Sequence, residues 1–62
     1  MMTIEDLRGR KFVCHNDEEI VYTVGRGKDG KTEINWGGSA DTTVYRDGQV
    51  EDFFERGIWI LL

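Results

Sequence analysis

Apolar and polar residues alternate along most of this chain, and this period of two predicts β-strands. The clearest case is residues 19–24, where every second residue is apolar and β-branched or aromatic residues dominate. In residues 31–36 the same alternation turns Ile34 and Trp36 inward. Shorter segments with this pattern predict three further strands, over residues 11–15, 42–45 and 58–62. The chain is therefore predicted to be rich in β-structure.

Turn-forming residues separate the predicted strands. Asp29-Gly30 is a favoured hairpin pair, because both central residues of such a turn need positive φ, and it lies in a glycine-rich tip over residues 25–30. Asn16-Asp17-Glu18 has turn chemistry because Asn and Asp side chains fold back on their own backbone. Gly37-Gly38-Ser39 is predicted to end a strand. These turns are tight, so neighbouring strands are expected to be antiparallel.

Two segments depart from the period of two. Near the start, Thr3 has capping-box spacing with an acid and Gly9 follows, which predicts one short helical turn. Later, apolar or small residues recur at helical spacing, at Val50, Phe53, Phe54 and Gly57. This spacing predicts an amphipathic helix near residues 47–56, with Asp47 as its N-cap and Gly57 just beyond its end.

The order of these elements bounds the fold class. The chain has 62 residues, which is too short for a doubly wound sheet or a TIM barrel and predicts a single small domain over residues 1–62. We predict a mostly β (α+β) protein: a small, strongly bent antiparallel sheet or SH3-like barrel. It should have about five strands, with one helix near residues 47–56 before the last strand.

Charge is distributed unevenly along the chain. Residues 1–31 hold six acids and six bases, whereas residues 32–62 hold six acids and two bases, so the second half carries the whole net charge of −4. A net acidic domain repels phosphate backbones, which argues against nucleic acid as a partner. One cysteine, and no apolar run of membrane-spanning length, predict a cytoplasmic protein without disulfides or membrane contact.

Residues 25–32 match the P-loop pattern G-x-x-x-x-G-K-T. A P-loop needs a helix directly after it, so that the helix N-terminus faces the phosphates. Here the following residues alternate as a strand, which favours a hairpin instead. The segment is then a basic hairpin tip formed by Arg26, Lys28 and Lys31. Nucleotide binding at residues 25–32 is kept as an alternative function.

No residues are predicted to be catalytic or to bind metal, and no cofactor is expected. Cys14 and His15 are adjacent in a strand, so their side chains point to opposite faces and cannot form a catalytic dyad. Cys14 shares a face with apolar neighbours and is expected in the core. The carboxylates of the predicted helix lie off its apolar side, where a solvated acidic surface is expected. We therefore predict that the protein is not an enzyme.

The binding residues predicted from the sequence are aromatic and acidic. Trp59 is expected in the core, whereas Trp36 stands at a strand end beside glycine and could serve, with Tyr45, as a binding platform. An acidic surface would add Asp47, Glu51 and Glu55. These residues predict a non-catalytic interaction module whose acidic C-terminal half and exposed aromatics bind a protein partner.

Two further possibilities remain open at this point. The first is a small nucleic-acid-binding barrel that uses the basic residues Arg8, Arg10, Lys11, Arg26, Lys28 and Lys31. The second is a homodimer that buries the apolar residues 58–62, because a domain of this size has a small core.

The spacing of several structural residues resembles that in a known group of proteins. These residues are Tyr22-Thr23-Val24, Ile34-Asn35-Trp36, Tyr45, Val50-Glu51-Asp52-Phe53 and Gly57-Ile58-Trp59. Over about residues 12–62 the chain resembles short proteins from phages, prophages and bacterial mobile elements. The resemblance implies an SH3-like or related α+β fold in a host-cytoplasmic protein. It implies no activity, and residues 25–32 are not part of the pattern.

Overall fold

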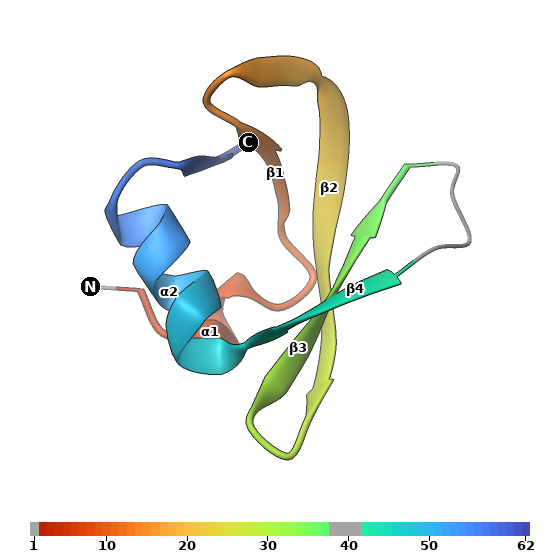
Figure 1. Ribbon diagram of the computed structural model, residues 1–62, viewed down its shortest axis with the longest axis vertical. Helices are drawn as coiled ribbons and strands as arrows, with labels where there is room; N and C mark the ends of the chain where they lie inside the picture. Colours follow the sequence, from red (N-terminus) through yellow and green to blue (C-terminus); the bar gives the residue numbers. More distant parts are fainter. Residues whose placement is uncertain (1, 38–41) are drawn as a thin grey trace.

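Five antiparallel strands form one sheet in the computed structural model, which describes residues 2–37 and 42–62 (Figure 1). The elements in chain order are α1 (Ile4–Leu7), β1 (Lys11–Cys14), β2 (Asp17–Lys28), β3 (Lys31–Trp36), β4 (Thr42–Arg46), α2 (Asp47–Glu55) and β5 (Trp59–Leu61). The strands lie in the order β4-β3-β2-β1-β5, so β4 and β5 form the two edges. The predicted mostly β fold, with about five antiparallel strands and a helix before the last one, is confirmed.

Strand β2 is the long central strand, and it bends. Its 12 residues would span about 36 Å if straight, whereas the longest extent of the Cα trace is 29 Å. The register with β3 shifts between Val24 and Gly27, and a second shift occurs in β1 between Phe12 and Cys14. Such bulges increase local twist and bend a strand. The N-terminal part of β2 therefore pairs with β1, and the remainder turns to pair with β3.

The hairpin between β2 and β3 is tighter than the sequence predicted. Asp29 and Gly30 both have positive φ, 56° and 75°, as a two-residue hairpin turn requires. However, β2 continues to Lys28, so residues 25–28 belong to the strand rather than to a glycine-rich tip. The bulge keeps these residues paired despite their glycines, because it absorbs the extra residue within the ladder.

The two helices begin and end where local chemistry predicts, with one exception. In α1 the Asp6 carboxylate accepts hydrogen bonds from the Thr3 amide and hydroxyl, at 3.2 and 3.0 Å. Gly57 follows α2 with a φ of 74°, as predicted for its end. The prediction of Asp47 as N-cap is wrong, because Arg46 is the N-cap and Asp47 lies in the first turn. Asp47 is held there by its backbone amide, which donates to the Gly30 carbonyl across the sheet at 2.9 Å.

The core lies between α1, α2 and one face of the bent sheet. Its buried apolar residues are Ile4, Leu7, Phe12, Val24, Ile34, Val50 and Trp59. Trp59 is the centre of an aromatic cluster, with ring centroids 4.5 Å from Phe12 and 4.6 Å from Phe53. This confirms Trp59 as a core residue. Cys14, half-buried, packs against the same cluster, as predicted.

Trp36 differs from its neighbours on β3. Its pairing with Tyr22 places it on the core side of the sheet, but its side chain is 42% exposed. The predicted inward face of Trp36 is therefore confirmed, and its exposure is that of a residue on the surface, which the sequence had left open. Gly37 forms a turn directly after β3, whereas Gly38 and Ser39, also predicted to end that strand, lie outside the described residues.

Among the described helices, none has the length and hydropathy needed to cross a membrane.

Candidate functional site

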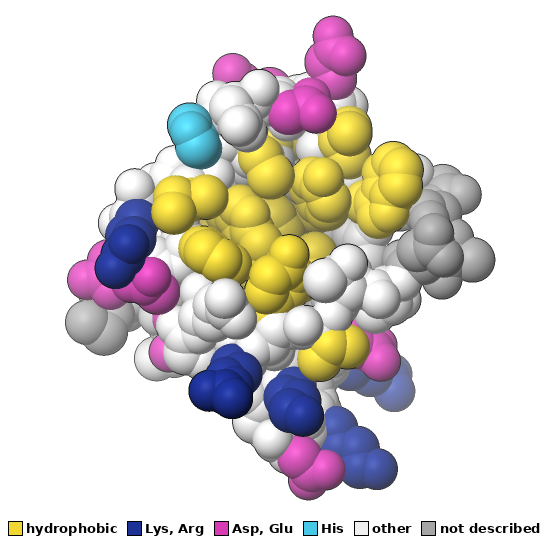
Figure 2. All heavy atoms as spheres, viewed as in Figure 1, with side chains coloured by type: hydrophobic (Ala, Val, Ile, Leu, Met, Phe, Trp, Pro, Cys, Tyr) yellow, Lys and Arg dark blue, Asp and Glu magenta, His cyan; other side chains and the backbone are white. Residues whose placement is uncertain are grey.

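The core side of the sheet extends beyond the helix that covers it, and this uncovered part forms an aromatic face. The aromatic face consists of Tyr22, Trp36 and Tyr45 of the sheet, together with Phe53 at the adjoining side of α2. Figure 2 shows apolar side chains gathered over the middle of the molecule, beside the residues that are not described. Of the predicted binding residues, Trp36 and Tyr45 therefore lie on one side of the sheet.

Register explains how Tyr22 and Trp36 come together. The Gly37 amide donates to the Val21 carbonyl at 3.1 Å, so the neighbouring pair Tyr22 and Trp36 is of the type that exchanges no hydrogen bonds. Side chains of such pairs approach each other most closely. The Tyr22 ring also stacks on Phe12 of the core, with centroids 5.3 Å apart and planes 15° from parallel. Trp36 is thus paired in the sheet with a residue that packs on the core.

Tyr45 of β4 and Phe53 of α2 form the part of the aromatic face where the sheet meets the helix. Their rings meet edge to face at 5.8 Å, and Tyr45 also contacts Trp59 at 5.3 Å. Both residues are half-buried, so they support the core and still present part of each ring to solvent. The Tyr45 side chain is therefore held in place by the core, and Trp36 is the most exposed residue of the aromatic face.

Burial also affects the phenol of Tyr22. The pKa of this side chain is raised above its ordinary value of about 10, mainly because desolvation disfavours the phenolate and secondly because of nearby Cys14. The Tyr22 hydroxyl is thus protonated throughout the physiological range, and the aromatic face carries no charge of its own from this group.

Groups of opposite charge lie near the two ends of β2, and the register places Lys31 and Arg46 on the side of the sheet opposite Tyr45. At one end is the acidic turn, which we define as Asp17, Glu18 and Glu19 at the start of β2, all exposed. At the other is the basic end, formed by Arg26, Lys28, Lys31 and Arg46, also exposed. Figure 2 shows acidic side chains where β1 turns into β2, Lys and Arg side chains around the β2–β3 hairpin, and apolar side chains between them.

The predicted basic tip borders a shallow hollow. Arg26, Lys28 and Lys31 line a hollow of about 460 Å³ together with Gly27, Asp29, Glu33 and Val44. Because two carboxylates share the hollow with these three bases, its local charge is only weakly positive. The remaining basic residues named by the sequence diverge: Arg10 and Lys11 are exposed near β1, whereas Arg8 turns inward.

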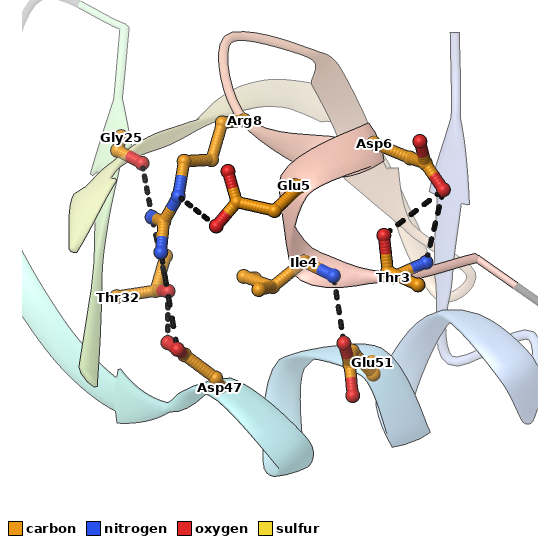
Figure 3. Close-up of polar contacts among 9 residues, drawn as sticks. All are labelled: Thr3, Ile4, Glu5, Asp6, Arg8, Gly25, Thr32, Asp47 and Glu51. Atoms are coloured by element: carbon orange, nitrogen blue, oxygen red, sulfur yellow. Dashed lines mark hydrogen bonds and ion pairs between the residues drawn. The ribbon is translucent and has the colours of Figure 1, made fainter. Parts of the chain in front are cut away.

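Arg8 is the centre of a polar node that ties α1, the sheet and α2 together (Figure 3). Its Nη1 donates to the Gly25 carbonyl at 3.2 Å and to the Thr32 hydroxyl at 3.4 Å. Its guanidinium also lies 3.8 Å from the Asp47 carboxylate and 3.7 Å from that of Glu5. The Thr32 hydroxyl in turn donates to Asp47 Oδ1 at 2.5 Å. Because Thr32 is fully buried, this hydroxyl depends on those partners.

The node accounts for the residues that resemble a P-loop. A Cβ added to Gly27 would lie 2.5 Å from both Arg8 Nη2 and the Lys31 carbonyl oxygen, and one added to Gly25 would lie 2.9 Å from Asn35 Nδ2. Glycine is needed here because other side chains approach the strand closely. Thr32 is occupied by the node, and β3 rather than a helix follows the turn. Residues 25–32 therefore form a bulged hairpin that packs on an arginine.

The acidic residues predicted on α2 do not form one free surface. Asp47 points into the polar node, and Glu51 Oε2 accepts a hydrogen bond from the Ile4 amide at 2.6 Å. Asp52 pairs with Arg56 one turn later, with nitrogen and oxygen 3.0 Å apart, at the i, i+4 spacing that favours such a pair. Glu55 is exposed. Two of the three predicted acidic binding residues thus hold the fold together.

Cys14 lies near Tyr22 of the aromatic face, whereas His15 points to solvent. His15 is exposed, and its Nδ1 lies 3.3 Å from the Ile58 carbonyl oxygen. Over residues 2–37 and 42–62, no three His, Cys, Asp or Glu side chains are placed to hold a metal ion.

Sequence reasoning missed the polar node, and it missed Tyr22 and Phe53 as parts of the aromatic face. The available signal for the node was the pair Gly25 and Gly27 directly after a predicted strand, since glycine in a strand often marks a close approach. In comparisons with known proteins, no family model matches the chain, and searches of the curated proteins and of the solved structures found no match.

Proposed function

We propose that this protein is a non-catalytic interaction module that binds a protein partner through its aromatic face. One observation carries the proposal: Trp36 lies on the core side of the sheet, yet 42% of its side chain is exposed. An indole that flanks a core and is left open to solvent is costly to hydrate, and covering it with a partner recovers that free energy.

The composition of the face supports this role. Tyrosine and tryptophan dominate the binding energy of protein interfaces, because they offer a large rigid area with a polar group at the edge. Here the two tyrosines are fixed by contacts with the core, Tyr22 through Phe12 and Tyr45 through Trp59, so they lose little side-chain entropy on binding. The acidic C-terminal half contributes less than the sequence suggested, since Asp47 and Glu51 make internal contacts.

The same proposal includes the finer fold description. A bent five-stranded antiparallel sheet of this length is compatible with an SH3-like barrel. The resemblance to short phage, prophage and mobile-element proteins supports a location inside a host cell and contributes nothing on activity.

Selection of peptides on the folded protein tests the proposal. A random peptide library displayed on phage is selected on the immobilised protein at low concentration, and the enriched peptides are measured against Trp36→Ala and Val44→Ala. Val44 is the matched control, because it is 54% exposed but points to the opposite side of β4 from Tyr45. We expect apolar peptides whose affinity falls by about tenfold or more in Trp36→Ala and is unchanged in Val44→Ala.

Thermal melts accompany both variants, so that loss of binding is read only from folded protein. If no peptide is enriched, or if enriched peptides bind Trp36→Ala as well as the parent, the aromatic face is not a binding surface.

A further inference from the structure

We infer that the outer edge of β4 is a second binding site, which takes an acidic peptide segment as an added antiparallel strand. The site differs from the aromatic face, because the register places Val44 and Arg46 on the side of the sheet opposite Tyr45. The inference therefore goes beyond the proposed function, and its test does not depend on Trp36.

The edge of β4 presents backbone groups that β3 does not use. Among the described residues, β3 is the only strand that pairs with β4. The Asp47 amide donates to the Gly30 carbonyl at 2.9 Å, which makes Lys31 and Arg46 a pair that exchanges no hydrogen bonds. Because the two kinds of pair alternate along an antiparallel ladder, the Val44 amide and carbonyl and the Arg46 amide point away from β3. A peptide strand placed there pairs with these groups, as in recognition by β-augmentation.

Three bases form a row across the sheet and end at this edge. Lys28 pairs with Lys31 across the hairpin, and Lys31 pairs with Arg46 on β4. Paired residues lie about 4.5–5.5 Å apart and point to the same side of a sheet, so three positive charges stand side by side. None of these bases has an ion-pair partner among the described residues. Like charges in register destabilise a sheet, and a carboxylate bound to the row relieves that repulsion.

The register also defines the pattern of side chains that the added strand needs. The hollow of about 460 Å³ lies on the side of the bases, since Lys31, Glu33 and Val44 line it. Val44 is 54% exposed and lies two positions before Arg46, so both face this side. In an antiparallel strand, an acidic residue opposite Arg46 is followed two positions later by an apolar residue opposite Val44. The segment therefore has the pattern acid-x-apolar.

A nucleic acid fits this edge less well than a peptide does. Phosphate groups accept hydrogen bonds but donate none, so they leave the Val44 carbonyl without a partner. Asp29 and Glu33 share the hollow with the bases, and the net charge of −4 repels a phosphate backbone further. A single carboxylate beside Arg46 avoids most of this repulsion.

Bases on an edge strand also have a protective use, because they keep the edge from pairing with other copies of the chain. That use alone does not explain Val44, which leaves an exposed apolar side chain in the middle of the edge. An edge that repels basic strands and offers an apolar contact selects for an acidic strand with an apolar residue.

Fluorescence anisotropy with defined, labelled peptides gives the first test. The peptide carries two Glu residues and then one Val at alternating positions, separated by Thr. One control has Lys in place of both Glu residues. A second control is methylated on the backbone nitrogen of its Val, which removes the amide that donates to the Val44 carbonyl. We expect the acidic peptide to bind, more weakly as salt is raised, and both controls to lose about tenfold or more in affinity.

Charge reversal in the protein gives the second test. Lys31→Glu with Arg46→Glu should lower the affinity for the acidic peptide by about tenfold or more. Arg10→Glu with Lys11→Glu is the matched control, because it changes the net charge equally at exposed residues near β1, with β2 and β3 between them and β4. It should change the affinity by less than about threefold. Glu33→Gln should raise the affinity, since it removes a carboxylate from the hollow. Thermal melts confirm that each variant is folded.

Hydrogen exchange locates the peptide on the edge. The Val44 amide points away from β3 and should exchange rapidly in the unbound chain, whereas the Thr43 amide is directed at β3 and should exchange slowly. Binding of the acidic peptide should slow exchange at Val44 and leave Thr43 unchanged.

Several outcomes would overturn the inference. They are no binding of the acidic peptide, equal binding of its N-methylated form, and equal binding by the Lys31→Glu, Arg46→Glu variant. Tighter binding of single-stranded oligothymidine that depends on Arg46 would assign the bases to nucleic acid instead. Trp36→Ala should bind the acidic peptide as well as the parent does, and a loss there would place the peptide on the aromatic face. The fate of this site and that of the proposed function are therefore read from different peptides and different variants.

Discussion

Replacement of Thr32 by valine tests whether the polar node stabilises the fold and whether the P-loop-like residues are structural. Valine keeps the branched shape and suits a strand, so the substitution removes a hydroxyl and little else. That hydroxyl is fully buried, donates to Asp47 at 2.5 Å and accepts from Arg8 at 3.4 Å. After the substitution, the Asp47 carboxylate loses its shortest hydrogen bond and keeps only the guanidinium 3.8 Å away.

The expected cost follows from the charge on the acceptor. A hydrogen bond to a charged group contributes about 1.5–3 kcal/mol, and the Asp47 side chain is only 26% exposed, which limits its replacement by water. A chain of 62 residues is expected to have roughly 3–9 kcal/mol of total stability. Thr32→Val should therefore remove a large share of the free energy of unfolding. For a domain of this size, about 1 kcal/mol shifts Tm by up to about 8 °C, so Tm should fall by roughly 10–20 °C.

Urea denaturation followed by circular dichroism measures the free energy, and Thr43→Val is the matched control. Thr43 is exposed on β4, the neighbouring strand, and should change the free energy by less than about 0.5 kcal/mol. If Thr32→Val also costs less than about 0.5 kcal/mol, or if the control costs as much, the hydroxyl does not hold the node together.

The same two proteins test the nucleotide-binding alternative. A ligand that prefers the folded state must raise Tm, so magnesium with ATP should leave the Tm of the parent chain unchanged if residues 25–32 form only a hairpin. A rise in Tm that disappears in Thr32→Val would refute the structural reading of this segment.

Three other measurements probe the remaining contacts. Gly27→Ala should cost about 2 kcal/mol or more, because its Cβ would clash with a guanidinium and a carbonyl oxygen, whereas Gly48→Ala, in open space within a helix, should raise Tm. Glu51→Ala should cost about 1–2 kcal/mol by freeing a backbone amide of α1, and Glu55→Ala should be neutral; equal costs in urea melts would contradict this. The Tyr22 phenol should ionise above its ordinary pKa in absorbance titrations. Because the folded state holds this proton more tightly, stability should be full below about pH 10 and fall as pH rises through the raised pKa, and Tyr22→Phe should remove that loss.

The periodicity of the sequence predicted the strands and α2 correctly, because the spacing of apolar residues reflects which side of each element is buried. Alternation placed Ile34 in the core, and the helical spacing of Val50 and Phe53 placed α2 against the sheet. The turn at Asp29-Gly30 was predictable for a different reason: its backbone geometry depends on two residues alone. In each case the determining interactions lie within a few residues of one another.

The candidate site was less predictable because its contacts join distant residues. Arg8 meets Thr32 and Asp47 across 24 and 39 positions of sequence, and no local pattern encodes such a meeting. The exposure of Trp36 has a similar origin. Alternation gives its face correctly, but whether that face is covered depends on where α2 ends in space, nine residues after it begins.

The charged residues show most clearly that the net charge of a sequence segment does not give the charge of the surface that this segment forms. The second half of the chain holds the whole net charge of −4, yet Asp47, Glu51 and Asp52 in that half are taken up by internal contacts. The first half has equal numbers of acids and bases, but β2 carries the acidic turn at its start and Arg26 and Lys28 at its end. Because a strand is stiff and extended, its 12 residues hold these opposite charges apart instead of letting them pair. The half that is neutral by composition therefore carries two separated groups of opposite charge on the folded surface.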